Sequence, residues 1–104
     1  MTTSEVKIQL TTIRDNLPPQ YSQSGARKLM SSYENYKHLI QVLGQSYSSI
    51  SSAVRGALPG IEAAIRQAIA GTPKKESEEC FRQGRQQITE GINSILLADA
   101  KKPG

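Results

Sequence analysis

Apolar residues recur at alternating steps of four and three through the middle of the chain. This spacing keeps them on one side of a helix, with the period of about 3.5 residues that is typical of helices packed along a seam. We call this set the 29–57 seam; its members are Leu29, Tyr33, Tyr36, Ile40, Leu43, Tyr47, Ile50, Val54 and Ala57.

The seam predicts one long helix over 25–57, which Ser22 or Ser24 is placed to cap. Gly44 and the serine-rich run 46–52 oppose it, because glycine and serine are poor residues for a helix interior. The apolar phase is nevertheless unchanged across Gly44, and a loop would have no reason to preserve it. We therefore favour a continuous helix, with Gly44 as the site of any bend. The alternative is a break at Gly44.

Three further segments carry shorter stripes. The first predicts a helix over 3–17, because Thr2 and Glu5 are spaced as a capping box and Pro18-Pro19 cannot continue a helix. Its stripe is Val6, Leu10, Ile13 and Leu17. Ile8 lies off this stripe, which predicts either exposure or contact with a neighbour.

Leu58-Pro59-Gly60 should end the long helix and start a helix over 59–70, because proline suits a first helical turn. Gly71 is placed as its C-cap. A last helix over 74–98 has acidic residues in its first turns, and 99–104 reads as a flexible tail. The apolar faces of these two helices are Ile61, Ile65, Ala68 and Ile69, and then Phe81, Ile88, Ile92, Ile95 and Leu96.

These elements predict an all-α fold. The chain is expected to form a single domain over 1–104, a small antiparallel bundle of about four helices organised around one long central helix. No strand pattern is visible in the sequence. A helix over 25–57 would reach about 50 Å at 1.5 Å per residue, which is more than its neighbours would cover. One end of the 29–57 seam should therefore remain for a partner.

Composition limits the cellular location that we expect and the kinds of cysteine site that the chain can form. Apolar residues make up 37% of the 104 residues, and the single cysteine, Cys80, excludes an intrachain disulfide and a cysteine-based zinc cluster. The start of the chain has no secretory signal pattern, and no apolar run is long enough to span a membrane. We expect a soluble cytoplasmic protein; export by a route without a cleaved signal stays open.

Candidate catalytic and metal-binding residues are sparse. His38 has only Glu34 at helical spacing, which is half of a metal site. Cys80 follows Glu76, Glu78 and Glu79, and these charges oppose formation of a thiolate. No phosphate-binding glycine loop is present. We therefore expect no catalytic residue, no metal and no cofactor, and we do not expect an enzyme.

The tyrosines suggest a surface for another protein. Three of the four lie on the 29–57 seam, and tyrosine is enriched at the energetic centres of interfaces. We expect a non-enzymatic protein–protein interaction module, such as an adaptor, small chaperone, inhibitor or assembly subunit, that docks a partner helix or a copy of itself along the seam. The candidate partner-binding residues are Tyr33, Tyr36, Ile40, Tyr47 and Ile50.

The charge supports an alternative function. The chain has a formal net charge of +4 and a pI near 9.4, which is compatible with a basic helical nucleic-acid-binding protein. That function requires the basic side chains to converge on one face, and it predicts binding that weakens steeply with salt. The residues concerned are Arg27, Lys28, Lys37, Arg55, Arg66, Arg82 and Arg85.

In size and helical make-up the chain is similar to the small helical-hairpin substrates and partners of type VII secretion. It departs from them at two points. It has no tryptophan for their Trp-x-Gly turn, and Pro18-Pro19 interrupts the place where their first long helix would run. No residue roles are carried over from that resemblance.

Overall fold

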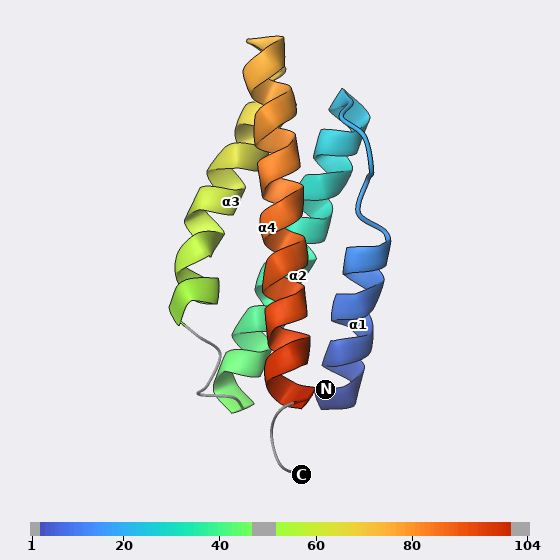
Figure 1. The fold of residues 1–104 in the computed structure, drawn as a ribbon, viewed down its shortest axis with the longest axis vertical. Coiled ribbons are helices and arrows are strands. Elements are labelled where there is room, and N and C mark those ends of the chain that lie inside the picture. Colours follow the sequence, from blue (N-terminus) through green and yellow to red (C-terminus); the bar gives the residue numbers. More distant parts are fainter. Residues whose placement is uncertain (1–2, 47–51, 101–104) are drawn as a thin grey trace.

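Four helices make up the computed structural model, which describes residues 3–46 and 52–100. They are α1 (Thr3–Asp15), α2 (Gln23–Ser46), α3 (Ser52–Ala70) and α4 (Lys74–Ala100). They run alternately up and down, so that the start of α1 and the last turns of α4 lie at the same end (Figure 1). The described residues contain no strand. The prediction of an all-α bundle of four helices is confirmed.

The predicted long helix over 25–57 is wrong. Helix α2 ends at Ser46, two residues beyond Gly44, and α3 begins at Ser52 and runs back beside α2 (Figure 1). An unbroken apolar phase in the sequence was therefore no proof of an unbroken helix. Residues 47–51 lie outside the described part of the chain. The bundle therefore has no single central helix: α2, α3 and α4 contain 24, 19 and 27 residues.

Pro59 does not start a helix, as the sequence suggested, but lies inside α3. Proline has no N–H, so the carbonyl of Arg55 loses its usual partner four residues along. Packing compensates for this cost, since α3 and α4 form the most extensive helix pair of the bundle. A proline inside a helix is thus tolerated where tertiary contacts hold the helix in place.

The other ends differ by a few residues from the prediction. Helix α1 stops at Asp15 rather than at residue 17, and Leu17 still reaches the core from the connection that follows. Ser22 caps α2, because its Oγ accepts a hydrogen bond from the Gly25 N–H at 2.8 Å. Helix α4 continues to Ala100, past the predicted end at 98. Residues 101–104 of the predicted tail, and Thr2 of the capping box, lie outside the described residues.

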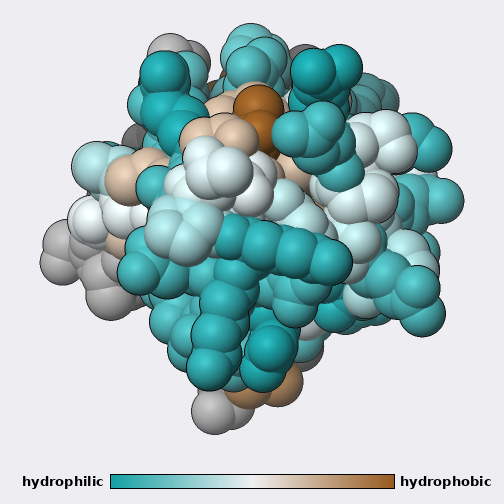
Figure 2. Space-filling view, turned by 90° about the horizontal axis from the view of Figure 1, so that it is seen from above, coloured by the Kyte–Doolittle hydropathy of each residue, from teal (hydrophilic) through white to brown (hydrophobic). Residues whose placement is uncertain are grey.

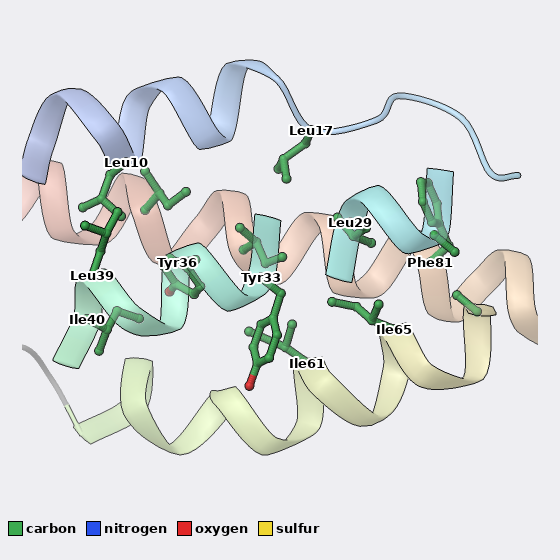
Figure 3. Close-up of a cluster of buried hydrophobic side chains, with 14 of the residues drawn as sticks. Leu10, Leu17, Leu29, Tyr33, Tyr36, Leu39, Ile40, Ile61, Ile65 and Phe81 are labelled. Carbon is green, nitrogen blue, oxygen red and sulfur yellow. The ribbon is translucent and has the colours of Figure 1, made fainter. Parts of the chain in front are cut away.

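The core lies along the axis of the bundle, where all four helices contribute side chains (Figure 3). The apolar stripes read from the sequence supply most of it. The buried hydrophobic residues are Val6, Leu10, Leu17, Ala26, Leu29, Tyr33, Tyr36, Leu39, Ile40, Ile61, Ile65, Ala68, Phe81, Ile88 and Ile92. Ile13, Ile69, Ile95 and Leu96 are partly buried against this cluster. The period of the apolar residues therefore identified the inner face of each helix.

A short polar turn joins α3 to α4. Gly71 takes the left-handed conformation (φ 77°) that ends many helices, as its predicted C-cap role requires. The fully buried Ser77 hydroxyl donates a hydrogen bond to the Gln67 carbonyl at 3.0 Å. The Gln67 side-chain amide donates to the Thr72 carbonyl at 2.9 Å. The first bond gives the buried Ser77 hydroxyl a partner, and the second links the last turn of α3 to the connection.

Replacing Gly56 or Gly60 by alanine is expected to stabilise the protein. Both glycines lie in α3, and a Cβ at either position meets no atom within 4 Å. Alanine would therefore gain helix propensity without a clash, about 0.5–1 kcal/mol for each substitution. The midpoint of thermal unfolding, followed by circular dichroism, should rise by a few degrees. Gly71→Ala is the control and should lower the midpoint, because its φ is positive.

Candidate functional site

Three of the five candidate partner-binding residues lie in the core of the chain itself. Tyr33 and Tyr36 are each 1% exposed and Ile40 is 2% exposed. They pack against residues of the same molecule, so this fold does not offer them to a partner. Tyr47 and Ile50 lie outside the described residues. Tyr33, Tyr36 and Ile40 are covered within the bundle because α3 runs back beside α2 (Figure 3).

Tyr33 extends from α2 toward α3, where its hydroxyl meets the backbone (Figure 3). The hydroxyl donates a hydrogen bond to the Leu58 carbonyl at 3.0 Å, directly before Pro59. Burial raises the pKa of Tyr33 above its usual value; the nearby Glu62 carboxylate raises it further, while Arg66 acts in the opposite direction. A buried tyrosine with a partner for its hydroxyl is a packing arrangement that joins two helices.

Tyr36 lies one turn further along α2 and reaches α4. Its hydroxyl oxygen occupies the space where a Cβ at Gly91 would stand. Burial raises the pKa of Tyr36 to about 12, with a further increase from Tyr33. The glycine thus creates the room that a large aromatic ring needs between α2 and α4. The two raised tyrosine pKa values follow from packing, and neither tyrosine is matched to proton transfer near neutral pH.

Alkaline pH is expected to destabilise the fold through Tyr36. The unfolded chain releases this proton near the ordinary value of 10.0, whereas the folded chain holds it to about 12. The contribution of Tyr36 to the free energy of unfolding is therefore fully present below pH 10. It falls as the pH rises from 10 to 12, by on the order of 2 kcal/mol. Urea unfolding at pH 8, 10 and 11.5 measures the loss.

Tyr36→Phe separates this effect from the titration of lysines. The variant has no phenol to ionise, so its stability should fall less steeply between pH 10 and 12 than that of the wild type. Equal slopes for the two proteins would show that the Tyr36 proton does not contribute.

The basic residues of the nucleic-acid alternative are distributed over α2, α3 and α4. Arg27, Lys28, Arg55, Arg66 and Arg82 are exposed, whereas Lys37 and Arg85 are partly buried. Two of these side chains have partners within the chain. Arg66 pairs with Glu62 at 3.3 Å on the same helix, and Arg85 Nε donates to the Pro18 carbonyl at 2.9 Å. Arg85 thereby fastens the α1–α2 connection to α4.

The end of the bundle that carries the α1–α2 and α3–α4 connections is mainly polar. Figure 2 looks onto this end and shows hydrophilic side chains over most of it, with apolar residues visible only in small separate areas. Beneath the surface, the Tyr21 hydroxyl donates to the Ala68 carbonyl at 3.1 Å, and the Tyr21 ring meets the Phe81 ring edge-on at 5.7 Å. These contacts hold the α1–α2 connection against α3 and α4.

Two large hydrophobic side chains of the described residues are well exposed. Ile8 on α1 is 65% exposed and Leu97 on α4 is 59% exposed. The position of Ile8 off its stripe allowed this outcome. Leu97 was missed, although a signal existed: Ile95, Leu96 and Leu97 are consecutive, and three consecutive helical residues cannot all face one core.

The residues weighed for catalysis or metal binding are not brought together into a recognisable site. His38 is exposed on α2, and Cys80 is a free, partly buried cysteine on α4. Among the described residues, no group of three or more histidine, cysteine, aspartate or glutamate side chains is placed to hold a metal ion. No helix within residues 3–46 and 52–100 combines the length and apolarity that crossing a membrane requires.

Comparison with known proteins gives no relative for this chain. No family model, no curated protein and no solved structure matches it.

Proposed function

We propose that this chain acts by binding another protein or a second copy of itself, as a non-enzymatic interaction module. The observation that carries the proposal is the exposure of Ile8 and Leu97 on a bundle whose other large apolar side chains, where described, are buried or partly buried. Because Tyr33, Tyr36 and Ile40 are buried in the bundle, the proposal does not place the contact on them. The proposed contact surface is the outer side of α1 and α4 around these two residues.

The packing of α1 against α4 brings the two residues to a similar height. Arg14 Nη1 donates to Asn93 Oδ1 at 2.7 Å, which places these two residues opposite each other on the antiparallel helices. Ile8 precedes Arg14 by six residues and Leu97 follows Asn93 by four, so they lie about 9 and 6 Å beyond this contact in the same direction. They therefore present apolar side chains at nearly the same level on neighbouring helices.

The size of the surface suits a protein partner. Full burial of an isoleucine or leucine side chain contributes about 1.5–3 kcal/mol, so these two side chains could act as anchors within a larger polar contact. A standard interface buries about 800 Å² on each partner. The bundle measures 48 × 23 × 20 Å, so one long side is large enough for such a contact.

The test uses the whole chain and a variant that makes the proposed surface charged. Light scattering over a concentration series, at low and high salt, gives the molar mass of the wild type and of Ile8→Lys/Leu97→Lys. Self-association through this surface would persist at high salt and be lost in the variant. The matched control, Gln83→Lys/Gln87→Lys, adds the same charges at exposed polar positions of α4 that lie ten or more residues before Leu97, and it should keep the association.

If the wild type is monomeric at every concentration, affinity capture from the source cells follows. A protein retained by the wild type and the control, but not by Ile8→Lys/Leu97→Lys, supports the proposal. Nucleic acid retained only at low salt, and equally by all three proteins, would favour the basic nucleic-acid-binding alternative. Absence of both self-association and selective protein capture would overturn the proposed surface.

A further inference from the structure

We draw no further inference here: the strongest candidate, the exposed stripe of small residues around Gly56 and Gly60 on the outer side of α3, is a surface patch, and nothing in the structure shows what covers it.

Discussion

Ile65→Ala is expected to lower the free energy of unfolding by about 2–5 kcal/mol, because it opens a cavity where three helices meet. Ile65 is 0% exposed. A Cβ built on Gly84 of α4 would lie 3.1 Å from Ile65 Cγ1 and 3.8 Å from Leu29 Cδ2 of α2. Since small domains are stable by only about 5–15 kcal/mol, the variant should unfold at much lower urea concentration.

The same contact supplies a second-site test. In the wild type, Gly84→Ala presses a methyl group against Ile65 and should give little or no gain in stability. In the Ile65→Ala background the methyl group enters the vacated space, so the two substitutions should couple favourably by about 1 kcal/mol or more. Strictly additive effects in urea unfolding would contradict this geometry.

Ile8→Ala is the control for a change at an exposed position. Ile8 is 65% exposed, so this substitution should change the free energy of unfolding by less than about 0.5 kcal/mol.

The inner face of each helix could be predicted because burial imposes its own spacing on the sequence. Val6 and Leu10 on α1, Ile61 and Ile65 on α3, and Ile88 on α4 were placed on apolar stripes, and all are buried. The helical period relates sequence directly to one side of the cylinder. Turn chemistry predicted a cap at Ser22 or Ser24 and a C-cap at Gly71; the structure shows Ser22 as the cap and confirms Gly71.

The connection between α2 and α3 could not be predicted by the same reasoning. Both helices bury an apolar stripe in one core, and the spacing from Leu43 to Val54 happens to continue the first stripe into the second. A continuing phase is therefore compatible with a turn as well as with an unbroken helix. The low helix propensity of serine was a better guide than the apolar phase, because α2 ends at Ser46. Pro59 was misplaced because tertiary contacts allow a proline inside α3.

The candidate site was harder to predict than the fold for a related reason. An apolar stripe has the same sequence whether it packs within the chain or against a partner, so Tyr33 and Tyr36 carried no mark of their internal role. What distinguishes them is the reach of their hydroxyls to α3 and α4, and this depends on the folded arrangement. Residues off the stripe, such as Ile8, are the more informative candidates for a surface.

Gly91→Ala is expected to destabilise the protein by about 1–3 kcal/mol, even though alanine is the better helix former. The added Cβ would overlap the Tyr36 hydroxyl oxygen and lie 3.0 Å from Tyr36 Cζ. Tyr36 is 1% exposed, and its rigid ring cannot move aside without displacing its neighbours in the core. Urea unfolding should therefore show a lower midpoint for Gly91→Ala, in contrast to the rise expected for Gly60→Ala.

Tyr36→Phe decides whether the clash is the cause. The phenylalanine ring removes the oxygen that overlaps the new methyl group but keeps the ring carbons near it, so Gly91→Ala should cost less in this background than in the wild type. A coupling energy of about 1 kcal/mol or more is expected from the double-mutant cycle. An equal cost in both backgrounds would mean that the destabilisation by Gly91→Ala does not come from overlap with the Tyr36 hydroxyl.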